Sequence, residues 1–280
     1  MKEPNLNKKI GRLLLDADKL KLADIELIEH CQREHGLHFG EAAVKLGMVA
    51  EADILQILAQ QFDYSYLQPG EGGFSAELLA AYQPFIPQVE AIRSLRSQLS
   101  LRWFSEEHKQ LALVGLGFGE GCSLLAANLA IVFSQLGQRT VLVDANLRGP
   151  RQHQLFNLTK SMGLSELLVG RTGMEAICEI PSFVDLSVLP AGTLPPNPQE
   201  LLGRPAFRLL MCDLAKNYDV TLLDTPGGLL YADTQNIVVQ TGAALLVVHK
   251  NHTRMSDALA LQAQLANANA QVVGVVLNEF

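Results

Sequence analysis

The segment GLGFGEGCSLLAANLA, residues 115–130, constrains the fold more than any other part of the chain. Its glycines alternate directly after a short aliphatic run, and a helical pattern follows from about Cys122. Glycine allows backbone N–H groups to approach a phosphate closely, and the N-terminus of a helix favours an anion. The segment therefore predicts a phosphate-binding loop between a buried strand and a helix. No window in it fits GxGxxG, so a dinucleotide-binding loop is not supported.

This loop lacks the lysine that phosphate-binding loops place before their Ser or Thr. Cys122 occupies that position and Leu116 replaces the first glycine, whereas Ser123 supplies the hydroxyl expected to bind Mg²⁺. A charge-assisted hydrogen bond contributes about 1.5–3 kcal/mol, so its loss predicts roughly ten- to hundredfold weaker nucleotide binding and a transition state weakened at least as much. A helix N-terminus also favours a lowered thiol pKa, and a thiolate would repel phosphate. The residues predicted to bind ATP are Gly117, Gly119, Glu120, Gly121, Cys122, Ser123 and Leu124.

Short aliphatic runs bounded by turn residues alternate with helical patterns over the second part of the chain. These runs are residues 111–114, 140–143, 186–189, 220–223, 243–248 and 272–277. Such runs are typical of strands buried in a parallel sheet. Repeated strand–helix units predict an α/β fold with a doubly wound, mostly parallel sheet, whose ligand loops follow the carboxyl ends of the strands.

Two of the predicted strands end in an aspartate. Asp144 ends the strand in TVLVDANLRGP, and Asp224 ends the strand in YDVTLLDTPGG. A single aspartate at a strand end is often only a turn cap, but two beside a phosphate-binding loop favour catalysis. We therefore predict Asp144 and Asp224 as catalytic residues, and Ser123 and Asp224 as ligands of Mg²⁺; the metal role of Asp144 follows only from the family resemblance described below.

The N-terminal part of the chain contains a repeat. Residues 9–32 and 38–61 align, and each half shows the pattern of a short helix, a turn and a longer helix. We expect a small all-helical domain over residues 1–67, a linker rich in Gly and Pro over 68–84, and the α/β domain over 85–280. The α/β domain is expected to begin with a helix near 88–104.

Charge and cysteine content limit the functions open to the chain. The formal net charge of -7 argues against a nucleic-acid partner. The cysteines are scattered without a CxxC pair, as expected for free thiols in a reducing cytoplasm. The sequence shows no signal-peptide pattern and no apolar stretch long enough for a membrane span. We therefore expect a cytoplasmic protein that is peripheral to the inner membrane through a partner.

Residues from about 85 to 280 resemble the bacterial tyrosine kinases that control polysaccharide chain length. The loop matches the family's Gly-Glu-Gly-Lys-Ser and Ala-Ala-Asn-Leu-Ala motifs except at Cys122, and VDANLRGP at 143–150 matches its second Walker motif. PAG at 190–192 and PPNPQELL at 195–202 match a further family signature. The stretches SLRSQLSLRWF and VVLNEF look closest to the exopolysaccharide (EpsG-type) branch.

The resemblance implies cofactors and partners. It implies ATP/ADP and Mg²⁺ as cofactors, Asp144 as a base or metal neighbour, and a membrane polysaccharide copolymerase (the chain-length determinant) as the partner. Glu90, Arg93 and Arg96 match an ExxRxxR motif that joins subunits into a homo-oligomeric ring. The alternative for these three residues is an intrahelical Glu–Arg pair, which contributes about 0.2–0.5 kcal/mol.

Residues 1–67 resemble the N-terminal domain of type II secretion ATPases and their relatives, some of which bind cyclic di-GMP through two such repeats. Lys9 and His38 replace the family's arginine, and Asp18 replaces the first inner glycine. A packing or partner-docking module is therefore the alternative to a cyclic di-GMP site. The candidate cyclic-dinucleotide residues are Lys9, Gly11, Gln32, His38, Gly40, Gly47 and Gln61.

Departures from the kinase pattern leave more than one function open. Cys122 replaces the lysine, Asn146 replaces the second acid of a DxD pair, and the tyrosines are dispersed rather than clustered at the C-terminus. The chain is then either a weakened tyrosine kinase, in which Arg148, Arg151 or a ring neighbour replaces the lysine, or a pseudokinase scaffold. A partition-type positioning ATPase is less favoured, because that family needs a second lysine where Gly117 stands.

Overall fold

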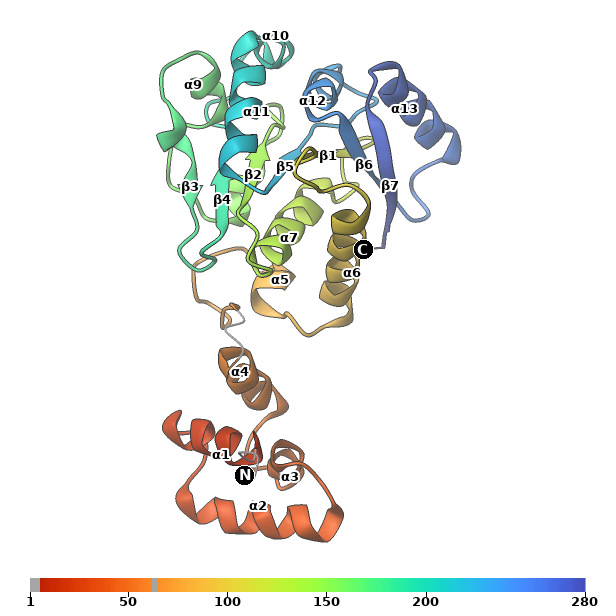
Figure 1. Cartoon of the computed structure of the whole chain (residues 1–280). Coiled ribbons are helices and arrows are strands. Elements are labelled where there is room, and N and C mark those ends of the chain that lie inside the picture. The colour runs from red at the N-terminus through yellow and green to blue at the C-terminus, as the bar shows by residue number, and fades with distance from the viewer. Residues whose placement is uncertain (1–5, 62–64, 280) are drawn as a thin grey trace. The chain divides into compact units, whose positions relative to one another are not determined.

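The computed structural model describes residues 6–61 and 65–279, and the chain separates into two compact units between Ser65 and Tyr66 (Figure 1). The first unit is all-helical, and Leu14, Ile28, Phe39 and Ala42 form part of its buried core. Its helices are α1 (Leu6–Asp16), α2 (Leu22–His35), α3 (Phe39–Lys45) and α4 (Glu51–Gln61).

The second unit is an α/β fold built on a seven-stranded sheet with the order β3-β4-β2-β5-β1-β6-β7. Each predicted aliphatic run lies inside one of its parallel strands, which confirms the doubly wound, mostly parallel sheet. The short β3 is antiparallel to β4, and the sequence did not predict it. The strands are β1 (Gln110–Gly115), β2 (Thr140–Asp144), β3 (Cys178–Glu179), β4 (Leu186–Leu189), β5 (Val220–Asp224), β6 (Ala243–His249) and β7 (Gln271–Asn278).

Helices cover both faces of this sheet (Figure 1). Leu129 and Phe133 belong to the core on one face, and Phe207, Leu214 and Leu261 belong to the core on the other. Burial on both faces explains why the strands are continuous aliphatic runs. The first face carries α5 (Leu79–Tyr82), α6 (Pro87–Arg102) and α7 (Cys122–Ser134), and the second carries α11 (Pro205–Asn217), α12 (Asp233–Thr241) and α13 (Met255–Asn267). Shorter helical segments are α8 (Gln152–Leu155), α9 (Leu164–Leu168), η1 (Met174–Ala176) and α10 (Pro198–Leu202).

Residues 68–84 do not form the predicted linker, because they belong to the second unit and their helix α5 packs against α7. Leu78, Ala80 and Ala81 are fully buried, and the Ala80 N–H donates to Asn128 Oδ1 at 2.8 Å. The glycines and proline of QPGEGGFS favour the prediction of a linker, although the short α5 follows them. Its small apolar residues allow a close fit to α7, and this fit is a tertiary contact that composition does not reveal.

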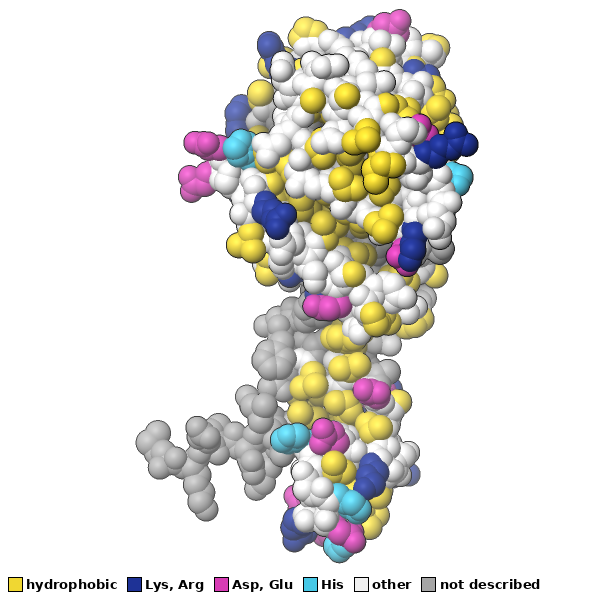
Figure 2. All heavy atoms as spheres, turned by 90° about the vertical axis from the view of Figure 1, so that its right-hand side faces the viewer, with side chains coloured by type: hydrophobic (Ala, Val, Ile, Leu, Met, Phe, Trp, Pro, Cys, Tyr) yellow, Lys and Arg dark blue, Asp and Glu magenta, His cyan; other side chains and the backbone are white. Residues whose placement is uncertain are grey.

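The β7 edge of the sheet carries an apolar surface. Figure 2 shows hydrophobic side chains gathered on this side of the second unit, where Met255, Leu259, Val275 and Leu277 are each more than half exposed. Within the described ranges, no helix has both the length and the apolar character needed to cross a bilayer.

Candidate functional site

The strand order β2-β5-β1 brings the predicted site residues to one edge of the sheet. Asp144 pairs with Asp224 across β2 and β5, and Leu113 of β1 pairs with Asp224 on its other side. Residues 115–123, called the glycine loop below, follow β1 directly. The two acids and this loop therefore meet at the carboxyl ends of neighbouring strands, where open α/β sheets bind ligands.

Each of the two acids is fully buried, and one of its oxygens lacks a hydrogen bond. Asp144 Oδ2 accepts the N–H groups of Arg151 at 3.0 Å and Gln152 at 2.9 Å. Asp224 Oδ2 accepts Gln152 Nε2 at 2.8 Å. Neither Oδ1 atom has a partner among the described residues. A buried carboxylate oxygen without a partner is costly, so these two atoms fit a bound cation.

Burial raises the pKa of both acids. Burial raises the pKa of Asp224 to about 6, while the neighbouring Ser123 and Gln152 side chains and the charge of Arg151 act in the opposite direction. The pKa of Asp144 lies well above its usual range because of burial and then the charge of Asp224. No group of three or more His, Cys, Asp or Glu residues gathers as a metal cage in the described part. The two carboxylates of Asp144 and Asp224 suit Mg²⁺, which binds one or two carboxylates together with water and phosphate oxygens.

The glycine loop is hydrogen-bonded to β7 and to the segment before α13. Gly119 and Gly121 have φ angles of 81° and 77°, a region that favours glycine, and α7 begins at Cys122. Glu120 Oε2 accepts the Thr253 hydroxyl at 2.7 Å, and the Glu120 carbonyl accepts Asn278 Nδ2 at 3.0 Å. Glu120, predicted to contact ATP, therefore anchors the loop to the segment before α13 through its side chain and to β7 through its backbone carbonyl.

The Cys122 thiol is neutral and turned toward the sheet. Its Sγ donates to the Leu113 carbonyl at 3.1 Å, and the Thr225 hydroxyl donates to the same carbonyl at 2.8 Å. Burial first, and then the charge of Asp224, raises the pKa of this thiol well above its usual value. The predicted lowering of this pKa at the helix N-terminus was wrong, because burial and the charges of Asp224 and Glu120 raise it. Cys122, like the other cysteines (Cys31, Cys178 and Cys212), forms no disulfide.

Gln152 connects both acids to the glycine loop, and sequence reasoning missed it. Its Nε2 donates to Asp224 Oδ2 and also to the Ser123 carbonyl at 3.0 Å, while its N–H binds Asp144. The side chain is fully buried. Glutamine carries no catalytic signature of its own, so only its position shortly after Asp144 could have indicated this role.

Two polar residues that follow β2, Asn146 and Arg148, bind other parts of the protein and not the glycine loop. The Asn146 side chain binds the N–H and carbonyl of Gly149 at 3.1 and 3.0 Å, which closes a local turn. Arg148 Nε binds Asp233 Oδ2 at 2.6 Å, and its guanidinium lies 4.2 Å from the centre of the Tyr231 ring. Arg148 is therefore not placed to replace the lysine.

The three residues of the predicted ring interface make contacts within this single chain. Arg93 Nη1 binds Glu90 Oε2 at 3.1 Å, which is the intrahelical pair expected as the alternative. Arg96 Nη1 donates to the Val132 carbonyl at 2.9 Å, which ties α6 to α7. The ring interface stays a prediction.

The candidate cyclic-dinucleotide residues are spread over the first unit. Gly11 and Gln32 line a groove of about 1310 Å³ together with Arg12 and Arg33. His38, Gly40 and Gly47 are not among the residues that line it, and a Cβ at Gly40 would lie 3.1 Å from Ile54, so this glycine has a packing role. Lys9 and Gln61 lie in α1 and α4, and their side chains fall outside the described part. Cyclic di-GMP binding stays a prediction.

Comparisons of sequence place the chain among kinases, although no family model matches it. It is 31% identical over 201 residues to tyrosine-protein kinase YwqD of Bacillus subtilis (strain 168), covering 72% of this chain and 85% of YwqD. It is 30% identical over 191 residues to the putative tyrosine-protein kinase CapB of Staphylococcus aureus, covering 68% of this chain and 84% of CapB. The putative tyrosine-protein kinase EpsB of Ralstonia solanacearum is 35% identical over 201 residues, and the chain spans only 27% of its length.

Solved structures agree with the sequence comparisons. The kinase domain of Escherichia coli tyrosine kinase ETK matches with a TM-score of 0.70 and 30% identity, over 72% of this chain and 79% of that one. The chimerical protein CapA2B2 matches with a TM-score of 0.69 and 30% identity, over 80% of this chain and 97% of that one. The septum site-determining protein MinD of Pyrococcus horikoshii, at 21% identity and a TM-score of 0.54, shares the fold. The chain belongs to the family of bacterial tyrosine-protein kinases that includes YwqD and CapB.

Proposed function

We propose that the second unit binds Mg·ATP at the edge formed by β1, β2 and β5 and transfers phosphate to tyrosine slowly, in the control of exopolysaccharide chain length. The observation that carries this proposal is a pair of buried oxygens beside the glycine loop, Asp144 Oδ1 and Asp224 Oδ1. Neither oxygen has a hydrogen-bond partner among the described residues. These atoms lose hydration without a protein partner in return, and a bound cation would compensate them. The alternative is a pseudokinase scaffold that uses the same site without transfer.

The residues at this edge divide the work of binding. Ser123, Asp144 and Asp224 would hold Mg²⁺, which when bound neutralises charge on the phosphates. The backbone N–H groups of the glycine loop, ahead of α7, would bind the phosphate oxygens. Gln152 keeps Asp224 and Ser123 in place through its two hydrogen bonds. Asp144, which pairs with Asp224 at the ends of β2 and β5, is the candidate base for the proton of a tyrosine hydroxyl.

Cys122 is the reason for proposing slow transfer. Its neutral thiol donates to the Leu113 carbonyl, so it places no positive charge on the β- and γ-phosphates. The transition state carries more developing charge at these oxygens than the bound nucleotide does. The loss of the lysine therefore weakens transfer more than it weakens binding.

A calorimetric titration of Mg·ATP into the purified protein tests this proposal. We expect saturable binding that requires Mg²⁺, together with a phosphotyrosine signal that is weak but above that of Asp224→Asn. Absence of binding at millimolar nucleotide would overturn the proposal. Normal binding with a signal equal to that of Asp224→Asn would instead favour the scaffold.

We predict that Gly227→Ala weakens Mg·ATP binding at least about tenfold while the protein stays folded. A Cβ at Gly227 would lie 2.8 Å from Gly117 Cα, so the glycine loop would have to move. Gly149→Ala is the matched control, because a Cβ there would only touch Asn146 at 3.9 Å. Equal affinities of the two variants, measured by calorimetry, would contradict the role assigned to the loop position.

The proposal extends to location and partner. We propose that the protein is cytoplasmic and is held at the inner membrane by a membrane polysaccharide copolymerase, as a homo-oligomeric ring joined through Glu90, Arg93 and Arg96. A putative tyrosine-protein kinase in the cps region of Klebsiella pneumoniae, 31% identical over 72% of this chain, supports the link to polysaccharide. The net charge of -7 gives no support to a nucleic-acid partner.

A further inference from the structure

The missing lysine leaves the glycine loop without a cation of its own, and we propose that Arg151 supplies this charge. In the free protein Glu77 binds Arg151, and the arginine exchanges Glu77 for a phosphate when nucleotide binds. This inference rests on the proposed nucleotide binding. It assigns a phosphate-contacting role to Arg151 and a competing role to Glu77.

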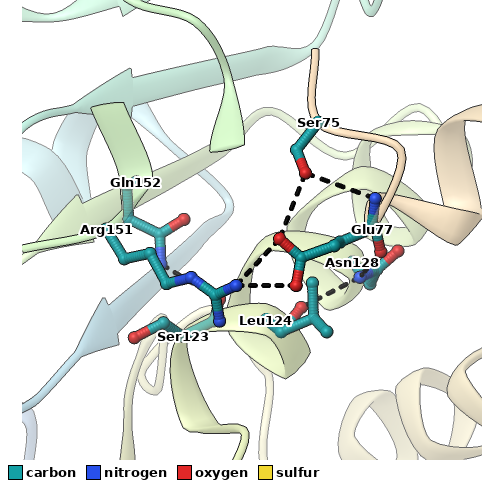
Figure 3. Close-up of polar contacts among 7 residues, drawn as sticks. All are labelled: Ser75, Glu77, Ser123, Leu124, Asn128, Arg151 and Gln152. Atoms are coloured by element: carbon teal, nitrogen blue, oxygen red, sulfur yellow. Dashed lines mark hydrogen bonds and ion pairs between the residues drawn. The ribbon is translucent and has the colours of Figure 1, made fainter. Parts of the chain in front are cut away.

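Arg151 lies at the cation end of the site. Its N–H donates to Asp144 Oδ2 at 3.0 Å, which fixes its backbone beside the acid pair. Its guanidinium lies between Ser123 and Glu77 in Figure 3, and Nη2 is 2.6 Å from Glu77 Oε2 and 2.8 Å from Oε1. The positive charge also acts on Asp224, whose pKa it lowers against the dominant effect of burial. The guanidinium is therefore close to the place where phosphates and a cation would meet.

Glu77 is held over the first turn of α7 by Asn128. The Asn128 Nδ2 donates to the Glu77 carbonyl at 3.3 Å and to the Leu124 carbonyl at 3.0 Å, as Figure 3 shows. The Ser75 hydroxyl donates to Glu77 Oε1 at 3.2 Å. Asn128 therefore fixes the backbone of Glu77 beside the first turn of α7, and the Glu77 carboxylate, bonded to Ser75 and Arg151, lies near the phosphate-binding end of the glycine loop.

The contact between Arg151 and Glu77 is suited to exchange. The two side chains are 40% and 49% exposed, and ion pairs in water at this exposure are weak. A phosphate carries more charge than a carboxylate and offers several oxygens to the planar guanidinium. Arg148, the other arginine after β2, is committed to the buried Asp233 carboxylate. Of these two arginines, Arg151 can change partner at little cost.

Calorimetric titration of Mg·ADP and Mg·ATP into the full chain and its variants tests the exchange. Arg151→Gln is expected to weaken binding roughly ten- to hundredfold, because one charge-assisted contact is lost. Glu77→Gln is expected to tighten binding a few-fold, because the competing carboxylate is gone. In the double variant, Glu77→Gln should add nothing beyond Arg151→Gln. Arg139→Gln is the matched control. Arg139 pairs with Asp219 at 2.8 Å, just before β2 and β5 begin, so this pair lies at the amino ends of the strands and away from the site at their carboxyl ends.

The outcomes separate this inference from the proposed function. Unchanged affinity in Arg151→Gln, with normal binding by the wild type, would overturn the exchange and leave nucleotide binding intact. Equal weakening by Glu77→Gln and Arg151→Gln would also overturn it, because the pair would then only brace the structure. A wild type that binds no nucleotide would overturn both. Thermal unfolding without nucleotide shows whether each variant is folded before its affinity is interpreted.

Discussion

Replacing Asp224 with asparagine is expected to stabilise the free protein and to abolish its Mg²⁺-dependent binding of nucleotide. Burial raises the pKa of this carboxyl from 3.8 to about 6. Each tenfold step in proton affinity corresponds to about 1.4 kcal/mol, so the ionised form lowers the free energy of unfolding by about 3 kcal/mol at neutral pH. Asparagine keeps an oxygen for Gln152 and carries no charge. We expect its Tm to lie about 5–10 °C above that of the wild type.

The pH dependence gives this prediction a sign. Asp224 ionises near pH 3.8 in the unfolded chain and near pH 6 in the folded one, so the folded state binds more protons between these values. The wild type therefore loses stability as the pH rises through this window and stays at the lower level above it. The gain in Asp224→Asn should be full near pH 7.5 and smaller near about pH 4.5. Mg·ATP should raise the Tm of the wild type and leave the variant unchanged.

Asp219 offers a control of the opposite sign. Arg139 lowers the pKa of Asp219, so this carboxylate is stabilised in the folded protein. Asp219→Asn should therefore lower the Tm slightly at neutral pH, because the pair is partly exposed and weak. If Asp224→Asn also lowered the Tm at neutral pH, the electrostatic cost assigned to the acid pair would be contradicted.

The second large effect is expected from Cys122→Lys, which should raise the initial rate of tyrosine phosphorylation by about a hundredfold. The ammonium group would reach the β- and γ-phosphates, where charge develops during transfer. The rate is measured as phosphotyrosine formed on purified protein with Mg·ATP. Cys122→Ser, which restores no charge, should stay at the wild-type rate, and Cys122→Lys combined with Asp224→Asn should be inactive.

This prediction separates a weakened kinase from a scaffold. A weakened kinase lacks the positive charge that a lysine would place inside the glycine loop, and restoring the charge at that position should recover the rate. A scaffold that lacks other parts of the catalytic machinery would gain affinity for nucleotide without gaining phosphotyrosine. If Cys122→Lys were no faster than Cys122→Ser, the missing lysine would not be what limits transfer.

The sheet and the acid pair could be predicted from sequence because their signals are local. Aliphatic runs between turns located the parallel strands, and parallel order places Asp144 and Asp224 together once both end neighbouring strands. Positions that depend on packing could not be predicted in this way. Gln152 and Glu77 act through contacts with distant segments, and β3 is only two residues long. No periodicity or motif marks any of these three features.

The pKa of the Cys122 thiol shows a second limit of sequence reasoning. The expected lowering followed from the helix N-terminus alone. The raised pKa follows from the burial of the thiol and its closeness to Asp224, which only the folded arrangement supplies. Asn146 shows the same limit. Its side-chain amide binds Gly149 and closes a turn, and no sequence motif predicts this contact.

The packing of α5 and Glu77 against α7 determines where a fragment of the second unit can begin. A fragment that begins at residue 85, as the motif boundaries recommend, would lose Glu77 and the Ala80 N–H that occupies Asn128. It would also uncover the surface of α7 that Leu78, Ala80 and Ala81 bury. A fragment that begins at Tyr66 keeps all of these. Studies of the isolated kinase unit should therefore use the fragment that begins at Tyr66, because the shorter fragment would lack the residues that pack beside the proposed nucleotide site.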